Sequence, residues 1–274
     1  MKLKLKNKLQ LLVMTGTLIS ILIMIGANYF FLKKEYHEKL KLVDLKNSIR
    51  STKLEISNII TSAIETSIVF ANDPVLIDWF KNSEKDDQLG QYVKTKLTNF
   101  TTDQSYFTSF AVNSKTYNFW VPGNKLLDVV SPNDPDDSWF FSSIKSQKKV
   151  QLNIDSNNEL GKTYLFVNTL IGKDLNNPQG VAGVGIELNE IKKKIIQSKL
   201  TDKSSIFLIN DQGKILISED NKQVNKQMTE VFPNSAQTIL QKFQHKDNDY
   251  QLVEMTDFNQ QTAIISKIKG TDYF

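Results

Sequence analysis

The stretch LNIDSNNELGKTYLFVN, residues 152–168, contains residue types that could bind a phosphate group. A phosphate-binding loop follows the pattern G-x-x-x-x-G-K-[ST], in which backbone N–H groups surround the phosphates and the lysine reaches them. Gly161, Lys162 and Thr163 match the end of this pattern. Ser156 occupies the position of the first glycine, so the sequence does not predict a nucleotide site here.

The same stretch carries oxygen ligands at alternate positions, as a calcium loop does. Such a loop needs oxygen ligands at positions 1, 3 and 5, glycine at position 6 and a bidentate glutamate at position 12. Counted from Asp155, the oxygen ligands fit, but Leu160 stands at the glycine position and Phe166 at the glutamate position. What remains is a β-hairpin, with NNELG as its turn and residues 163–171 as its returning strand.

The chain has few of the residues that other catalytic and metal-binding patterns need. His37 and His245 are the only histidines and there is no cysteine, which disfavours a histidine cluster, a thiolate site and a Ser-His-Asp triad. Ser142 and Lys145 have the three-residue spacing of serine–lysine acyl enzymes, a spacing that is common by chance on a helix. The glycines of GVAGVG lack the full dinucleotide pattern and predict close packing. The sequence therefore predicts no enzyme, no metal site and no cofactor.

Charge is balanced outside the N-terminus. The formal net charge of +4 equals the contribution of the four lysines in residues 1–10, and the first 32 residues contain no acid. A body with equal numbers of basic and acidic residues gives nucleic-acid binding little support. A chain without cysteine is compatible with a location outside the cytoplasm.

Residues 11–32 predict a transmembrane helix. They carry no charge, and 22 residues at about 1.5 Å each cross a hydrocarbon core roughly 30 Å thick. The run is longer than the apolar region of a cleaved signal peptide, and it ends in an aromatic belt at Tyr29, Phe30 and Phe31. Because basic residues favour the cytoplasmic side, we expect residues 1–10 to be a cytoplasmic leader and the rest of the chain to lie outside the cytoplasm.

After the membrane segment, residues 33–75 predict a long helix, which we call the stalk. Apolar residues recur at spacings of three, four and seven, and neither glycine nor proline occurs between Lys33 and Asn72. Pro74 then breaks the pattern and starts a short apolar helix around Trp79. The apolar stripe fits packing on the chain's own domain, and it also fits a homodimer through the stalk, which we expect.

The remaining residues alternate between strand and helix patterns, which predicts an α+β fold. Residues 106–121 are rich in β-branched and aromatic types and end at the turn sequence PGNK, and Ser138 stands where it could cap a short helix. The runs KTYLFVNTLI and GVAGVGIEL predict two strands, and NEIKKKIIQSKL predicts an amphipathic helix. A second unit repeats the order of elements: a strand pair around NDQG, a helix at NSAQTILQKFQ and two strands in YQLVEMT and QTAIISKIKGTDYF.

The sequence DDSWFFSSIKSQKKVQLNIDSNNELGKTYLFVNTLIGKDLNNPQGVAGVGIELNEI resembles the membrane-distal module of a double Cache domain, the extracytoplasmic sensing region of bacterial chemoreceptors, sensor kinases and diguanylate cyclases. FLINDQGKILIS and SKIKGTDYF resemble the membrane-proximal module. The resemblance implies two PAS-like modules with antiparallel sheets, a distal one over residues 76–200 and a proximal one over residues 201–274 that is incomplete at its C-terminus. It also implies the bacterial inner membrane, with one N-terminal span.

In such proteins a small molecule binds in the distal module and a conformational change passes toward the membrane. The resemblance implies an arginine two residues before the tryptophan and an aspartate after the Gly-Val run in members that bind amino acids. Asp137 and Gly185 stand at those positions, and Phe140 stands where a tyrosine is typical. The resemblance therefore argues against a free amino acid held in that way.

The residues left as candidates for the ligand wall combine aromatic rings with amide and carboxylate groups. They are Tyr117, Trp139, Asn153, Asp155, Tyr164 and Asn168. The leading hypothesis is the sensing region of a transmembrane receptor that binds a small organic molecule and signals to a cytoplasmic output domain not contained in these residues. The alternative is a single-span, membrane-anchored protein that binds a solute or partner without signalling.

Overall fold

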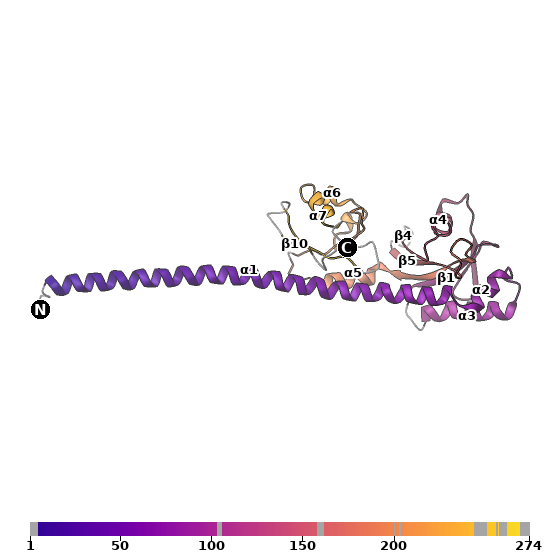
Figure 1. The fold of residues 1–274 in the computed structure, drawn as a ribbon, viewed down its shortest axis with the longest axis horizontal. Helices are drawn as coiled ribbons and strands as arrows, with labels where there is room; N and C mark the ends of the chain where they lie inside the picture. Colours follow the sequence, from indigo (N-terminus) through magenta and orange to yellow (C-terminus); the bar gives the residue numbers. More distant parts are fainter. Residues whose placement is uncertain are drawn as a thin grey trace. The chain divides into compact units, whose positions relative to one another are not determined.

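The computed structural model describes residues 5–102, 106–157, 162–199, 201–202, 204–243, 251–255, 257 and 262–268. The chain divides into two compact units, Met1–Ile49 and Arg50–Phe274. Most of the predicted turn NNELG, as well as His245 and the last six residues, lie outside the described residues. Figure 1 shows the order of the elements along the chain.

The described part of the first unit is helical, and its apolar side chains from Leu12 to Leu32 are exposed. Helix α1 runs from Leu5 to Ala71. Its segment Leu12–Lys33, 22 residues with a mean hydropathy of 1.7 and no buried residues, is long and apolar enough to cross a membrane. The segment Val43–Ala71 also passes this test of length and composition, but one third of its most apolar stretch is buried within the protein.

The buried residues of α1 belong to the core of the second unit. Ile56, Ile60, Ala63 and Phe70 are almost fully buried and recur at spacings of three, four and seven, which places them on one side of the helix. The helix ends just before Asp73, whose side chain accepts a hydrogen bond from the N–H of Val75 at 2.8 Å and so caps α2 (Pro74–Lys81). The predicted break at Pro74 and the short helix around Trp79 are confirmed.

A six-stranded antiparallel sheet forms the centre of the second unit, with the strand order β3-β2-β1-β6-β5-β4. Its strands are β1 (Thr108–Asn113), β2 (Asn118–Val121), β3 (Lys125–Val129), β4 (Val150–Asn157), β5 (Lys162–Leu170) and β6 (Gly180–Glu187). The described parts of β4 and β5 pair in register from Val150 with Thr169 to Asn157 with Lys162, which confirms the predicted hairpin.

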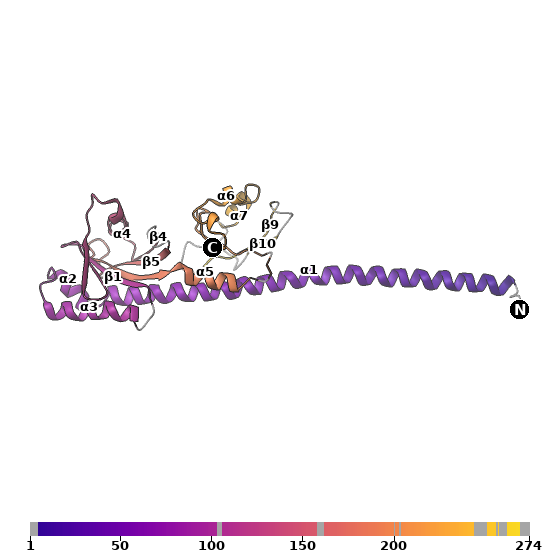
Figure 2. The ribbon, with the colours of Figure 1, turned by 180° about the vertical axis from the view of Figure 1, so that it is seen from behind.

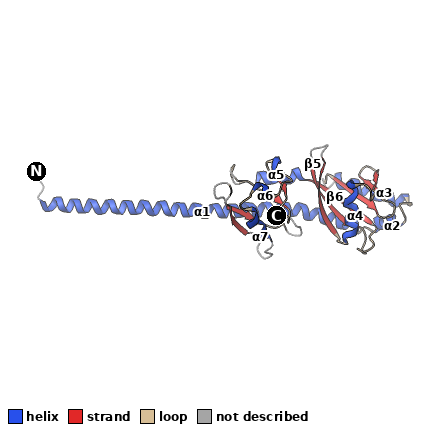
Figure 3. Cartoon of the chain, turned by 90° about the horizontal axis from the view of Figure 1, so that it is seen from above, coloured by secondary structure: helices blue, strands red, loops and turns tan. Residues whose placement is uncertain are grey.

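Helices cover both faces of this sheet. The part of α1 from Arg50 onward, α2 and α3 (Asp87–Thr102) pack on one face, and α4 (Ser138–Ser146) lies on the other. Figure 2 shows the same arrangement from behind. Seen from above, α4 lies over the strands of the sheet (Figure 3). The sheet is therefore enclosed on one face by a large core and on the other by a smaller aromatic cluster.

Two details of this sheet differ from the sequence prediction. The strand-like run at residues 106–121 forms two strands, β1 and β2, because the chain reverses between them and Tyr117 takes a left-handed backbone conformation with φ 61°. Ser138 is not the helix cap that the sequence predicted. A short 3-10 helix, η1 (Pro135–Asp137), precedes α4, so the helical turn begins earlier, and Asp134 caps it by accepting from the N–H of Asp136.

The last part of the chain contains two small antiparallel sheets around its own core. The elements after β6 are α5 (Leu188–Gln197), β7 (Leu208–Ile209), β8 (Ile215–Ile217), η2 (Asn221–Gln223), α6 (Met228–Val231), α7 (Ala236–Phe243), β9 (Gln251–Glu254) and β10 (Thr262–Ile265). Strand β7 pairs with β8, and β9 pairs with β10. These elements match the predicted strand pair, helix and two final strands.

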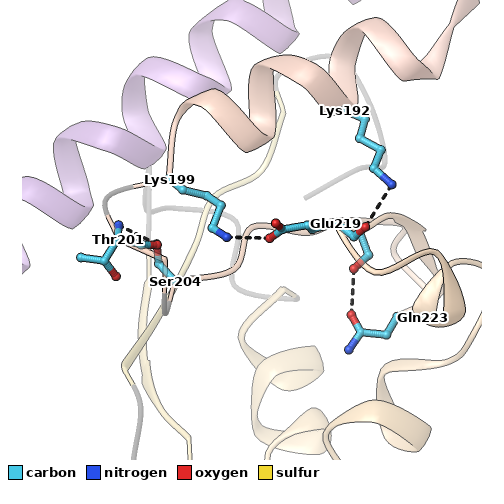
Figure 4. A network of polar contacts seen from close by, with 7 residues as sticks. Lys192, Lys199, Thr201, Ser204, Glu219 and Gln223 are labelled. Atoms are coloured by element: carbon cyan, nitrogen blue, oxygen red, sulfur yellow. Dashed lines mark hydrogen bonds and ion pairs between the residues drawn. The ribbon is translucent and has the colours of Figure 1, made fainter.

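Two lysines, Lys192 on α5 and Lys199 just after it, contact the segment that follows β8 (Figure 4). The ammonium group of Lys199 lies 2.6 Å from the carboxylate of Glu219. Lys192 donates to the backbone carbonyl of Glu219 at 3.1 Å and to the side chain of Asn221 at 2.5 Å. Ser218 beside them donates to Gln223 at 2.8 Å. The helix that follows β6 is thus joined to the segment after β8.

Candidate functional site

The sheet face that α4 covers carries most of the predicted ligand residues. Alternate residues of a strand point to opposite faces, and the strand register places residues on neighbouring strands side by side. We call this side of the sheet the α4 face, and its described positions are Thr108, Phe110, Val112, Phe119, Val121, Lys125, Asp128, Gln151, Asn153, Asp155, Asn157, Lys162, Tyr164, Phe166, Asn168, Leu170, Val181, Gly183, Gly185 and Glu187.

Aromatic rings form a continuous row across the α4 face. Phe107 stacks on Tyr164 with ring centroids 4.1 Å apart, and Tyr164 contacts Phe166 at 6.1 Å. Phe166 meets Phe110 at 6.2 Å, and Phe110 meets Trp139 of α4 at 5.5 Å. Each ring therefore touches the next from the edge of the face to the covering helix, which gives an apolar wall suited to an organic ligand.

Two glycines of β6 let these rings lie close to the sheet. A Cβ atom on Gly185 would come within 2.9 Å of the Phe166 ring and of the Thr108 methyl group. A Cβ atom on Gly183 would overlap the carbonyl oxygen of Val167 and lie 3.1 Å from the Phe110 ring. The prediction that the glycines of GVAGVG permit close packing is confirmed, and the space is taken by backbone and aromatic rings.

Two buried polar atoms on the α4 face have no hydrogen-bond partner among the described residues. They are the hydroxyl oxygen of Tyr164 and the amide oxygen of Asn168, whose side chains are only 3% and 4% exposed. A buried polar group without a partner costs free energy, so native proteins rarely leave one unpaired. Both atoms are therefore available to a ligand.

Two carboxylates flank Tyr164 on this face. The register pairs Tyr164 with Asp155 on β4 and with Glu187 on β6, so the phenol stands between the two acids in one cross-strand row. Asp155 is exposed, and Glu187 is half-buried and accepts a hydrogen bond from the side chain of Asn189 at 3.0 Å. This end of the α4 face therefore carries two carboxylates, and Lys162 occupies the next position on the same face of β5.

Five of the six predicted residues come together in this arrangement. Asn153, Asp155, Tyr164 and Asn168 share the α4 face, and Trp139 reaches it from α4. Tyr117 lies at the turn before β2 and packs instead against Phe140 and Phe141, with ring centroids 6.3 and 5.9 Å away. Their role in binding stays a prediction.

Sequence reasoning missed four residues that the fold adds to the face: Phe107, Phe110, Phe166 and Glu187. Their alternation with buried residues was visible, but strand register is needed to place them beside Tyr164 and Trp139.

The positions that differ from the amino-acid-binding pattern have other roles. The carboxylate of Asp137 is 8% exposed and accepts a hydrogen bond from the N–H of Ser131 at 2.7 Å, which fastens the loop before α4. Gly185 has no side chain and so leaves space for the Phe166 ring. Phe140 is buried in the aromatic cluster beneath α4. The chemistry of these three residues thus serves packing and loop structure.

Lys149, just before β4, has its ammonium group near the end of β5, and its pKa is altered. The ammonium group of Lys149 donates to the side chain of Asn72 at 2.9 Å and to the carbonyls of Leu170 and Gly172 at 2.8 Å each. Burial lowers the pKa of Lys149 below its ordinary value. This lysine joins the connection after β5 to the end of α1.

In the described part of the chain, no three His, Cys, Asp or Glu side chains gather where they could hold a metal ion.

No family model matches the chain. Its fold is similar to solved ligand-binding domains of amino acid chemoreceptors. The domain of Pseudomonas aeruginosa PctC in complex with GABA is 15% identical, with a TM-score of 0.57 over 82% of this chain and 93% of that one. The domain of P. aeruginosa PctB with L-Gln is 16% identical, with a TM-score of 0.59 over 84% and 86%.

The domain of Pseudomonas fluorescens chemoreceptor CtaA with L-leucine is 20% identical, with a TM-score of 0.56 over 84% of this chain and 92% of that one. These domains are double Cache domains. The likeness covers 82–84% of this chain in these three structures, and the antiparallel six-stranded sheet together with a second small sheet matches a Cache sensor domain. The chain therefore has the double Cache fold of chemoreceptor ligand-binding domains.

Proposed function

We propose that this chain is the extracytoplasmic sensing region of a bacterial transmembrane receptor and binds a small organic molecule on the α4 face. The observation that carries the proposal is a pair of buried polar atoms in a wall of aromatic rings, the hydroxyl of Tyr164 and the amide oxygen of Asn168, neither of which has a partner among the described residues. The fold supports it, because the solved domains that share this fold hold amino acids or GABA.

A matched pair of variants on one strand tests the binding site. Asn168 and Thr169 are neighbours, both are buried and both have an unpartnered polar atom among the described residues, but Thr169 lies on the opposite face of the sheet. The full chain in lipid nanodiscs is screened by thermal unfolding against amino acids, amines, organic acids and sugars. A compound at a hundred times its dissociation constant adds about 2.7 kcal/mol to the free energy of unfolding.

The proposal expects at least one compound to raise the melting temperature saturably. Asn168→Leu removes the acceptor and abolishes most of the shift, whereas Thr169→Val leaves it in place. A shift that survives in Asn168→Leu, or the absence of a saturable shift with every compound class, contradicts binding at the α4 face.

We also propose that the protein sits in the bacterial inner membrane through Leu12–Lys33, with Arg50 and later residues outside the cytoplasm. The hydropathy of that segment and the basic leader before it support this orientation. The chain has no cysteine, so a single introduced cysteine is an unambiguous label site. With Asp87→Cys, at an exposed position at the start of α3, a membrane-impermeant maleimide should label intact spheroplasts, and protection until lysis would contradict the orientation.

We propose that two copies of the chain form a homodimer along the stalk. This dimer relays the conformational change on ligand binding toward the membrane. On α1, Thr61 is exposed, whereas Ala63 is fully buried in the core of its own domain. In membranes, Thr61→Cys should form a disulfide-linked dimer on oxidation and Ala63→Cys should not. Equal behaviour of the two variants contradicts a dimer through this face of the stalk.

A further inference from the structure

We infer that the end of α1 can slide along the sheet and that Lys149 is the lock that fixes its position. The lock consists of the Lys149 ammonium group and its three oxygen acceptors, which belong to Asn72, Leu170 and Gly172. Three features lead to this role: the contacts of the ammonium group, the place of Lys149 in the chain and the packing of α1.

The ammonium group of Lys149 brings three segments of the chain together. It donates to the side chain of Asn72, directly after α1, at 2.9 Å. It also donates to the carbonyls of Leu170, the last residue of β5, and of Gly172, at 2.8 Å each. Gly172 in turn donates its N–H to the carbonyl of Ala71, the last residue of α1, at 3.0 Å. Lys149 therefore holds the end of α1 both directly and through Gly172.

The end of α1 lacks a positive charge of its own. Helix α1 has no basic residue in its last turn. The C-terminal end of a helix carries a partial negative charge, because its last carbonyl groups have no partner within the helix. Lys149 brings an ammonium ion to this end from 77 positions beyond Asn72 in the sequence. The electrostatics of the helix end thus favour the lock.

The backbone of Lys149 belongs to the sheet that carries the α4 face. Strand β4 begins at Val150, directly after it, and the N–H of Leu170 donates to the carbonyl of Lys149 at 3.0 Å. Leu170 lies two positions after Asn168 on β5, so the lock stands beside the proposed ligand residues. A displacement of β5 would therefore move one acceptor of the lock directly.

The buried side of α1 becomes small toward this end. Ala63, Ser67 and Ala71 are fully buried and follow one another at intervals of four, which places them along one side of the helix. The large side chain of Phe70 instead packs against Phe100 of α3, with ring centroids 5.1 Å apart. Large side chains thus join α1 to α3, and small ones remain for its other contacts.

The sheet presents small residues on the face opposite α4. The register places Thr169, Ala182 and Ala111 side by side in one cross-strand row, and both alanines share a core with α1. The hydroxyl groups of Ser67 and Thr169 are buried and have no hydrogen-bond partner among the described residues. Neither hydroxyl therefore fixes the helix on the sheet.

Such packing offers little resistance to a small sliding movement. Small side chains make shallow ridges, and packed helices in proteins are known to shift by sliding along one another. A polar contact at the end of the helix then decides where the helix rests. Because Lys149 is anchored in the sheet and reaches the end of α1, it is suited to this role.

Pulsed electron–electron double resonance between two spin labels measures the position of α1 on the sheet. The chain has no cysteine, so labels can be attached at Val69→Cys on α1 and Leu127→Cys on β3, both of which are exposed positions. The labelled full chain in lipid nanodiscs is diluted with unlabelled native chain, which removes distances between two copies. With Lys149 in place we expect one narrow distance distribution.

The matched variants are Lys149→Met and Lys148→Met. Both changes remove one ammonium group, but Lys148 is exposed and stands one position before the lock. We expect Lys149→Met to add a second population displaced by up to one helical turn, about 5.4 Å, and Lys148→Met to keep the narrow distribution. Lys149→Arg retains the charge and the N–H donors and should restore it.

Measurements well below the melting temperature separate a change of position from a loss of stability. A narrow, unshifted distribution in Lys149→Met overturns the inference, and so does an equal second population in Lys148→Met. Asn72→Ala removes one acceptor and leaves Lys149 in place, and it should show a smaller second population. If Lys149→Met does not fold, an unshifted distribution in Asn72→Ala overturns the lock. No ligand is present, so these results are independent of binding at the α4 face.

Discussion

The indole of Trp139 on α4 meets the ring of Phe110 on β1 edge to face, with the ring centroids 5.5 Å apart and the ring planes at 84°. Trp139 makes a similar contact with Phe119, at 5.8 Å. These contacts hold α4 on the sheet, and because Trp139 is only partly buried, part of its ring remains available at the α4 face.

Trp139→Phe should therefore affect binding more than folding. The smaller ring can keep an edge contact with Phe110, so we expect a loss of about 1 kcal/mol or less in the free energy of unfolding. Ligand affinity should fall about tenfold, which corresponds to about 1.4 kcal/mol. Urea unfolding and calorimetry on the same preparation give the two values, and equal losses would assign Trp139 to the core alone.

Gly183 and Gly185 should respond differently to alanine. At Gly183 the new methyl group would meet a backbone carbonyl, so we expect Gly183→Ala to lower the free energy of unfolding by about 3 kcal/mol or more. At Gly185 it would meet the side chains of Phe166 and Thr108, which can move. Gly185→Ala should cost about 1–2 kcal/mol in urea unfolding and weaken ligand binding by displacing the Phe166 ring. The reverse order of stabilities would contradict this reading of β6.

Glu84 should act as a structural acceptor between the end of α2 and β2. Its carboxylate accepts from the hydroxyl of Thr116 at 2.7 Å, the amide of Asn118 at 2.5 Å and the indole N–H of Trp120 at 3.1 Å. Glu84→Gln places an N–H₂ group among these donors, and we expect it to lower the free energy of unfolding by about 1–3 kcal/mol. The exposed Glu65→Gln on α1 is the control, and a similar effect of both changes in urea unfolding would refute the role of Glu84.

The last part of the chain, after α5, should lose stability in acid through Asp257. A side-chain hydrogen bond from Ser235, with further bonds from Asn234, lowers the pKa of Asp257 below its ordinary value. A lowered folded-state pKa means that the unfolded chain binds more protons in acid. The stabilising contribution is therefore present above the unfolded value of about 3.9 and is lost as the pH falls through the lower folded value.

Asp257→Asn should remove this part of the pH dependence. Melting temperatures of the full chain between pH 3 and pH 7 would show a smaller acid-induced decrease in this variant than in the native chain. Asp211→Asn, an exposed change in the β7–β8 turn, is the control and should keep the native profile. Parallel profiles for all three proteins would rule out Asp257 as the source.

The ion pair between Lys199 and Glu219 should contribute little stability by itself. Glu219 is half exposed, and exposed pairs contribute about 0–1 kcal/mol. We expect Lys199→Glu and Glu219→Lys each to lower the free energy of unfolding by at most about 1 kcal/mol, and the double charge swap to recover most of the loss. Additive losses in this double-mutant cycle would show that the two side chains do not interact.

The sequence allowed much of the fold to be predicted because local patterns were strong. The β4–β5 hairpin was predicted from turn residues between two strand-like runs. Close packing at β6 was predicted because glycine has no side chain to keep neighbouring groups away. Helix α3 was missed although Val93, Leu97 and Phe100 have helical spacing. Strand β3 gave no signal, because all of its residues are exposed at the sheet edge and no alternation marks them.

The candidate site was predictable only in part, for a different reason. Trp139, Tyr164 and Asn168 stand out by residue type, but their neighbours depend on pairings between strands far apart in sequence. The row that places Asp155, Tyr164 and Glu187 side by side requires the register of three strands. Tyr117 lies apart from the other five candidates because its left-handed turn directs it toward Phe140 and Phe141.

The division of each strand between two faces has an evolutionary consequence. On β5, Leu165 and Val167 belong to the large core beneath α1, α2 and α3. Tyr164, Phe166 and Asn168 lie on the α4 face. Mutations at the second set can change what the domain recognises without disturbing the residues that hold it together. A duplicated gene could therefore acquire a new chemical preference through a few codons, and homologues could diverge in specificity faster than in architecture.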